Sequence, residues 1–131
     1  MTVLTATADL QSEFRDLLEA AAAAHAGDLH IRLEGDVAKV FATLRGQATA
    51  VIEWPAARCE SFLSAVFGLC DKADAFTYGT ARNMRLSGER FTLPGKVSGC
   101  LVQFLPPSDG GRVLVVRINY EGDACCGSCG G

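Results

Sequence analysis

The residues of this chain that could do metal or redox chemistry are concentrated at its C-terminal end. Cys126 and Cys129 form a C-x-x-C pair, and Cys125 directly precedes it. This spacing suits tetrahedral zinc or a dithiol that exchanges with disulfides. A zinc site would need a fourth ligand from elsewhere, and the sequence has no second C-x-x-C. We therefore predict exposed thiols and no cofactor, with zinc bound by these three cysteines as the alternative.

A second polar pair lies near the middle of the first apolar run. Asp28 and His30 are two residues apart, and a carboxylate that orients an imidazole is a frequent part of catalytic sites. No local motif marks a serine or cysteine nucleophile beside them. We therefore interpret His30 as a structural histidine at a sheet edge, with Asp28 and His30 kept as a candidate polar site. The sequence predicts no enzymatic activity.

Arginines form the third candidate site. Arg82 and Arg85 lie in a segment bounded by Gly79 and Gly88. Arginine can pair bidentately with a carboxylate or a phosphate. The alternative is that these are outward charges of an ordinary strand. We interpret them as the centre of a surface that binds a protein partner.

Three other cysteines, Cys59, Cys70 and Cys100, each stand alone within apolar patterns. Isolated cysteines of this kind behave as small core residues. The absence of an export signal also favours thiols over a disulfide framework. We therefore expect all three to be buried thiols.

Composition limits the class of protein. The chain has 131 residues, of which 49% are hydrophobic and 21% charged, and its net charge is −3. These values predict one globular domain. No basic run is present, which argues against nucleic-acid binding by phosphate neutralisation. The longest apolar stretch near the N-terminus, residues 20–24, is too short to span a bilayer, so we expect a cytoplasmic protein.

Hydrophobic periodicity predicts a helix followed by a β-meander in the first half of the chain. Apolar residues recur at helical spacing from Asp9 to Ala26, and Gly27 is placed to end that helix. Residues 27–46 read as a β-hairpin because two apolar runs flank Glu34-Gly35-Asp36 and the second run alternates with period two. Residues 48–54 alternate again and form a third strand.

The second half predicts one more helix and then further strands. Pro55 to about Cys70 carries one apolar stripe. Strand-like runs follow at 75–78, 84–86, 90–93, 97–105 and 112–120. The fold class is therefore α+β, a largely antiparallel sheet of about six to seven strands with two main helices on one face. Residues 1–120 form the predicted domain, and 121–131 are a Cys/Gly-rich tail.

Several short segments, in order, resemble the N-terminal domain of type II secretion and type IV pilus assembly ATPases. These are Gly27-Asp28-Leu29-His30-Ile31, the helix Phe62–Leu69, and Leu105-Pro106 followed by Gly110-Gly111 and Val113–Arg117. The resemblance covers roughly residues 10–120. It implies a PAS-like arrangement and a partner among secretion or pilus ATPases.

The chain departs from that family at the positions that contact nucleotide. It has no P-loop motif. Of the family's phosphate-contacting arginines only Arg82 is matched, and Thr43 and Leu101 stand where the others would lie. The resemblance therefore implies a non-enzymatic interaction domain, an accessory or assembly factor or a fragment of a longer ATPase, without ATP hydrolysis. Self-association is left open.

Two other functions stay open at this point. One is a small protein that binds metal or exchanges thiols through its cysteine tail. The other is a sensory domain that holds a small ligand beneath a curved sheet, since helices over an antiparallel sheet often leave a pocket.

Overall fold

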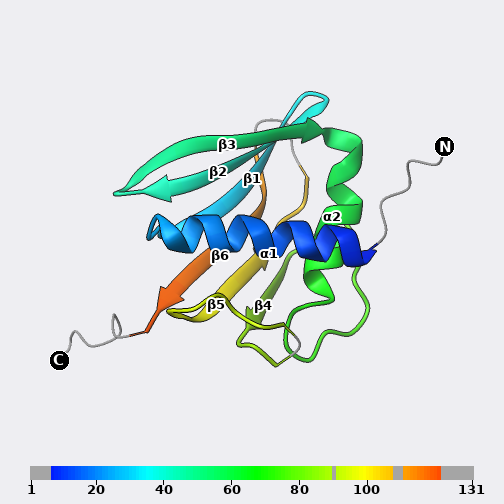
Figure 1. The fold of residues 1–131 in the computed structure, drawn as a ribbon. Helices are drawn as coiled ribbons and strands as arrows, with labels where there is room; N and C mark the ends of the chain where they lie inside the picture. The colour runs from blue at the N-terminus through cyan, green and yellow to red at the C-terminus, as the bar shows by residue number, and fades with distance from the viewer. Residues whose placement is uncertain (1–6, 90, 108–110, 122–131) are drawn as a thin grey trace.

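Two helices pack on one face of a six-stranded antiparallel sheet in a computed structural model, which describes residues 7–89, 91–107 and 111–121 (Figure 1). The elements are α1 (Thr7–Ala23), β1 (Asp28–Glu34), β2 (Val37–Leu44), β3 (Gln47–Pro55), the 3₁₀ turn η1 (Ala56–Arg58), α2 (Cys59–Phe67), β4 (Arg82–Leu86), β5 (Val97–Phe104) and β6 (Arg112–Tyr120). Their order across the sheet is β3-β2-β1-β6-β5-β4. The predicted α+β class, with its antiparallel sheet and two helices, is confirmed.

The predicted amphipathic helix is present as α1, and it lies along the sheet (Figure 1). Its apolar stripe is buried: Leu10, Phe14, Leu18 and Ala21 are at most 5% exposed. The side-chain amide of Gln11 donates a hydrogen bond of 3.0 Å to the C=O of Ala65 in α2. Burial of the stripe fixes α1 on the sheet, and this hydrogen bond fixes it against the second helix.

The expectation that Gly27 ends the first helix is wrong. The helix stops at Ala23, and His25 takes a left-handed conformation with φ 58°. The backbone N–H groups of His25 and Ala26 donate back to carbonyls of the last helical turn at 2.9 Å, as in a Schellman motif. The His25 ring stacks on Tyr120, with 4.1 Å between ring centroids. Glycine is the usual residue at this left-handed position after a helix. The stacking on Tyr120 explains why His25 stands there instead.

Both predicted hairpin connections are present as tight turns. Gly35 has φ 63° between β1 and β2, and Arg45 and Gly46 have φ 54° and 81° between β2 and β3. Two consecutive positive φ values are typical of a type I′ turn, whose twist matches the flanking strands. In β3 one residue, Val51, stands opposite no partner between the pairs Val40–Ile52 and Phe41–Ala50. It forms a β-bulge that ends the simple alternation predicted for this strand.

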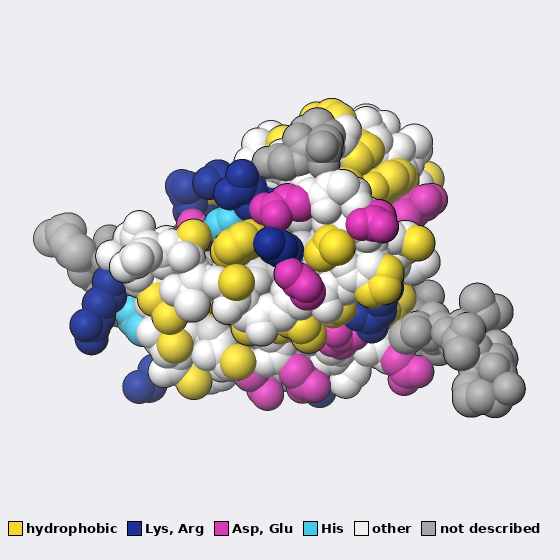
Figure 2. Space-filling view, turned by 90° about the horizontal axis from the view of Figure 1, so that it is seen from above, with side chains coloured by type: hydrophobic (Ala, Val, Ile, Leu, Met, Phe, Trp, Pro, Cys, Tyr) yellow, Lys and Arg dark blue, Asp and Glu magenta, His cyan; other side chains and the backbone are white. Residues whose placement is uncertain are grey.

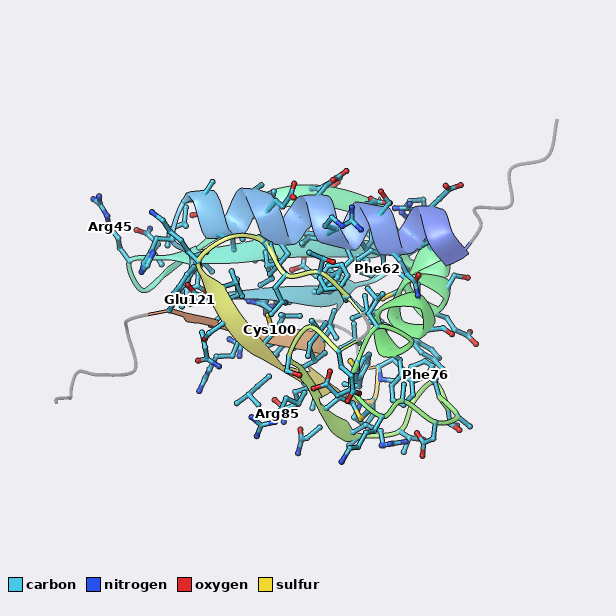
Figure 3. All side chains as sticks on the ribbon, turned by 60° about the horizontal axis from the view of Figure 1, so that its bottom comes forward. Arg45, Phe62, Phe76, Arg85, Cys100 and Glu121 are labelled. Atoms are coloured by element: carbon cyan, nitrogen blue, oxygen red, sulfur yellow. The ribbon has the colours of Figure 1, made fainter. Side chains whose placement is uncertain are left out.

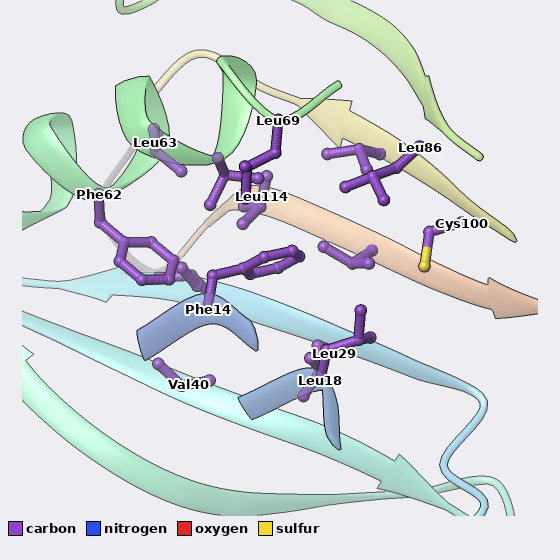
Figure 4. Packing of buried hydrophobic residues seen from close by; sticks show 14 of the residues in the cluster. Phe14, Leu18, Leu29, Val40, Phe62, Leu63, Leu69, Leu86, Cys100 and Leu114 are labelled. Carbon is purple, nitrogen blue, oxygen red and sulfur yellow. The ribbon is translucent and has the colours of Figure 1, made fainter. Parts of the chain in front are cut away.

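The core lies between the sheet and the two helices (Figure 4). Phe14 of α1 meets Phe62 of α2 edge-on, with 6.3 Å between ring centroids. Trp54, at the end of β3, packs on Phe62 at 4.6 Å. The largest fully buried side chains come from both helices and from the inner face of the sheet. Apolar burial is therefore what holds the two layers together.

Two predicted strands, at 75–78 and 90–93, are wrong. Residues 75–78 and 91–93 form no strand, and residue 90 lies outside the described residues. Phe76 packs between Phe67 and Phe104, at 5.2 and 5.4 Å between centroids. Phe91 is buried against Phe14 at 5.9 Å. The apolar residues that looked like strands are loop residues that fill the core.

The second helix is shorter than predicted. Pro55 ends β3, a 3₁₀ turn follows, and the α-helix runs only from Cys59 to Phe67. An ion pair between Arg58 and Glu13 links this turn to α1. Within the described part of the chain, neither helix has the length and apolar character needed to cross a membrane.

Candidate functional site

The two arginines predicted to form one surface lie on different sides of β4. Arg82 is held in the structure: its guanidinium lies 5.1 Å from the centroid of the Phe67 ring and pairs with Asp74 at 3.1 Å. Arg85 is exposed and points away from the helices (Figure 3). Because successive strand residues alternate between faces, residues three apart cannot share one. Arg82 therefore belongs with the helices, and Arg85 belongs to the opposite face of the sheet.

That opposite face has no helix over it among the described elements (Figure 1). Buried Leu86, Cys100 and Val102 point toward the helices, so their strand neighbours point the other way. The side chains on this helix-free face over β4, β5 and β6 are Asn83, Arg85, Leu101, Gln103, Val115 and Arg117.

The charged residues of these three strands are all positive. β4, β5 and β6 contain four arginines, Arg82, Arg85, Arg112 and Arg117, and no Asp or Glu. The whole chain is nevertheless acidic, with a net charge of −3. Among the described residues no carboxylate lies within 4.0 Å of the guanidinium of Arg85 or Arg117.

A hollow of about 370 Å³ opens on the helix-free face. Its lining consists of Asn83, Met84, Leu101, Val102, Gln103, Val115 and Arg117. Leu101 is 45% exposed, and it shares this degree of exposure only with Val51 and Ile52 among the large apolar side chains of the described residues. The hollow therefore combines an apolar floor with two amides and one exposed guanidinium.

Sequence reasoning did not single out Arg117, and it noted Leu101 only as a departure from the ATPase family. A signal was present in the alternation of the last two strands. Leu101 falls between the buried residues Cys100 and Val102, and Arg117 falls between Val116 and Ile118. Alternation places both side chains on the face away from the core. That they are neighbours follows from the pairing of β5 with β6, which the sequence pattern does not specify.

The other candidate pair, Asp28 and His30, lies on the same helix-free face in the neighbouring strand β1, where Asp28 pairs with Arg117 and His30 pairs with Val115. His30 is 3% exposed and stacks on Phe41, with 5.1 Å between centroids and 14° between planes. Its Nδ1 lies 3.7 Å from the Asp28 carboxylate, which accepts a hydrogen bond of 2.7 Å from the Thr43 hydroxyl. The expected place at a sheet edge is wrong, since β1 pairs with β2 on one side and β6 on the other.

The surroundings of His30 favour the neutral form of its imidazole by lowering its pKa. Burial lowers its pKa most, and the positive charge of Arg112 lowers it further. Asp28 acts in the opposite direction and offsets part of the shift. Burial and stacking on an aromatic ring favour a structural role for His30, which stays a prediction.

Acid is expected to destabilise the protein through His30. Because the pKa of His30 is lowered on folding, the unfolded chain takes up this proton first, and stability is lost as pH falls through about 6.5 and below. The melting temperature should therefore drop more steeply from pH 7.5 to 5 in wild type than in His30→Gln. Thermal melts by circular dichroism at closely spaced pH values measure this. Parallel curves for the two proteins would show that His30 does not contribute.

Cys59, Cys70 and Cys100 are buried thiols, as predicted. Burial raises the pKa of Cys59 to about 11 and those of Cys70 and Cys100 to about 12. The thiolate, which is the reactive form, is therefore scarce near neutral pH. Cys125, Cys126 and Cys129 lie outside the described residues. In the described part of the chain no group of three or more His, Cys, Asp or Glu side chains is placed to hold a metal ion.

Thiol labelling should separate the buried cysteines from the tail. In a variant with Cys125, Cys126 and Cys129 replaced by serine, a thiol reagent at pH 8 should label the native protein hardly at all. Denaturant should then expose all three body thiols together, because each is buried in the same core. Counting labelled thiols by mass spectrometry gives the result. Rapid native labelling of any body thiol would contradict the burial described above.

The space between the helices and the sheet is nearly filled. The hollow lined there by Phe14, Leu29, Phe62 and their neighbours measures about 10 Å³, roughly enough for a single water molecule. A larger, open hollow of about 180 Å³ lies on the same side of the sheet, where α1 passes over the β2–β3 hairpin. Neither a protein-family model nor a curated protein sequence matches the chain.

Proposed function

We propose that the protein is a non-enzymatic interaction domain that binds an acidic segment of a protein partner across the helix-free face of β4, β5 and β6. One observation carries the proposal: exposed Leu101 lies in an open hollow beside Arg117, on strands without a single carboxylate. A face that no described helix covers, and whose strands β4, β5 and β6 contain arginines but no Asp or Glu, is suited to a partner of negative charge.

Each side chain of the hollow has a distinct role in such an interface. The guanidinium of Arg117 can hold a carboxylate through two parallel hydrogen bonds. The amides of Asn83 and Gln103 can bond the backbone of an extended segment. Leu101 supplies the apolar contact, and burying a leucine side chain contributes about 1.5–3 kcal/mol. Arg85, paired across from Leu101, adds a second positive charge.

The resemblance to secretion and pilus ATPase domains suggests the kind of partner. If it reflects descent, the chain acts as an accessory or assembly factor in such a machine, and the acidic segment belongs to one of its components. The chain has no P-loop motif, and we expect no ATP hydrolysis. The proposed interface does not depend on this assignment, because it is derived from the residues of the sheet.

Photo-crosslinking can find the partner. A benzoylphenylalanine placed at position 101 in cells of the source organism should capture a peptide rich in Asp and Glu, because the probe lies beside Arg117 in the hollow. The same probe at Glu19, an exposed position on α1, is the matched control. Identical adducts from both positions, or adducts at 101 that carry no acidic residues, would contradict the proposal.

A further inference from the structure

The outer edge of β3 is an uncovered strand edge. All of its nine residues except Trp54 are exposed, and Val51 and Ile52 are 50% and 39% exposed. In the described part of the chain, residues 47–55 make no backbone hydrogen bonds beyond those of the β2–β3 ladder. At the opposite edge of the sheet, by contrast, the N–H of Asp71 donates to the C=O of Arg85 at 2.8 Å and covers β4. An uncovered apolar edge is a template for another strand.

An apolar groove lies directly beside this edge. It measures about 180 Å³, and its lining comes from the C-terminal half of α1 and the β2–β3 hairpin. Leu17, Ala20, Ala24, Leu44 and Val51 are among the residues that line it. Figure 2 looks onto the side of the molecule where β3 lies, and hydrophobic side chains are spread across it. The edge and the groove together form one continuous apolar surface.

The backbone of β3 selects a register for pairing. Leu44 and Gln47 close the two-residue turn and face each other, so the N–H and C=O of Ala48 and Ala50 point outward, away from β2. We propose that β3 pairs antiparallel with β3 of a second copy of the chain about a two-fold axis at Thr49. In this register Ala48 of each copy exchanges hydrogen bonds with Ala50 of the other.

Charge complementarity favours this occupant and this register. Glu53 is the only charged residue of β3, and Arg45 in the preceding turn projects at the end of the hairpin (Figure 3). Pairing about Thr49 brings the turn that carries Arg45 of each copy alongside the end of β3 that carries Glu53 of the other, so two opposite-charge contacts can form and no like charges meet. Such cross-strand pairs are stabilising. An unrelated apolar peptide would gain no such pair of contacts.

The same register also covers apolar surface. A two-fold axis between antiparallel strands stands perpendicular to the sheet, so the helices of both copies lie on one side of a continuous sheet. The two grooves then face each other across the axis. Val51 of each copy comes to lie beside Gln47 of the other, which reduces its exposure to water.

The mass of the full chain in solution tests the proposal. Light scattering at micromolar concentration should give twice 13.8 kDa for wild type. Thr49→Lys places two like charges at the axis and should weaken dimerisation at least about tenfold. Thr80→Lys, the same change near the opposite edge of the sheet, should leave the dimer intact. A monomeric wild type, or a Thr49→Lys protein that dimerises like wild type, would overturn the proposal.

A disulfide tests the register. In a variant without the tail cysteines, Thr49→Cys should crosslink under mild oxidation, because residues facing each other across the axis have Cα atoms about 4.5 Å apart. Gln47→Cys should not crosslink, since the two copies of residue 47 lie about 13 Å apart in this register. Crosslinking of Gln47→Cys but not of Thr49→Cys would overturn the pairing about Thr49. If the protein is instead a monomer that binds an added apolar peptide, the edge of β3 belongs to another occupant and the dimer proposal is wrong.

Discussion

Replacing Phe14 with alanine is expected to lower the free energy of unfolding by about 3–5 kcal/mol. Phe14 is 1% exposed and contacts the rings of Phe62 and Phe91. It therefore joins α1, α2 and the loop that precedes β5 at one point. Figure 4 shows Phe14 beside Phe62 in the core. Truncation leaves a cavity that helices fixed to a sheet can close only in part. Urea unfolding followed by circular dichroism measures the change.

Ser12→Ala is the matched control for this substitution. Ser12 lies on the exposed side of the same helix, and its truncation should change stability by less than about 0.5 kcal/mol. A loss below about 1 kcal/mol in Phe14→Ala would contradict the central place of this side chain in the core. Equal losses in both variants would point instead to an effect on the helix as a whole.

Arg117→Glu is expected to weaken binding of the acidic segment captured at position 101 by on the order of 100-fold. The substitution removes a charge-assisted contact and places a like charge opposite the partner's carboxylate. Losses of about 2–5 kcal/mol are typical when one member of a charge pair that is buried and hydrogen-bonded in the complex is removed. Isothermal titration with the synthetic segment gives the affinity. Because Arg117 is exposed, a thermal melt should show only a small loss of stability.

Arg15→Glu is the matched control for charge. It makes the same change at an exposed arginine of α1, on the helix side of the sheet. Its affinity for the segment should stay close to that of wild type, and the difference between the two variants should shrink as salt is added. Equal loss of affinity in both would mean that net charge, and not the helix-free face, governs binding.

The parts of this fold that sequence could predict are those with a local signal. The helix predicted from Asp9 to Ala26 and the hairpin predicted over 27–46 have regular periodicity, and the structure confirms both, with the helix at Thr7–Ala23. Gly46 marks a turn because it needs a positive φ. Phe76 and Phe91 misled the prediction because short apolar runs look the same whether they pair as strands or fill a core from a loop.

The candidate site could be predicted only in part, because it depends on contacts between distant segments. His30 was expected at an edge, yet β6 returns to pair with β1 and encloses it. Arg82 and Arg85 looked like one cluster in sequence, but strand alternation separates them onto two faces. Arg117 joins Leu101 only through the pairing of β5 with β6. Strand order of this kind is set by the whole core, not by any one run of residues.

Nuclear magnetic resonance mapping is the most direct test of the proposed interface. Titrating the ¹⁵N-labelled protein with the acidic segment captured at position 101 should shift amide signals of 83–86, 100–104 and 114–118, and those shifts should saturate. A segment with its Asp and Glu changed to Asn and Gln should produce much smaller shifts at the same concentrations. Saturable shifts confined to α1 and β3, or equal shifts with both segments, would contradict binding of an acidic partner on the helix-free face.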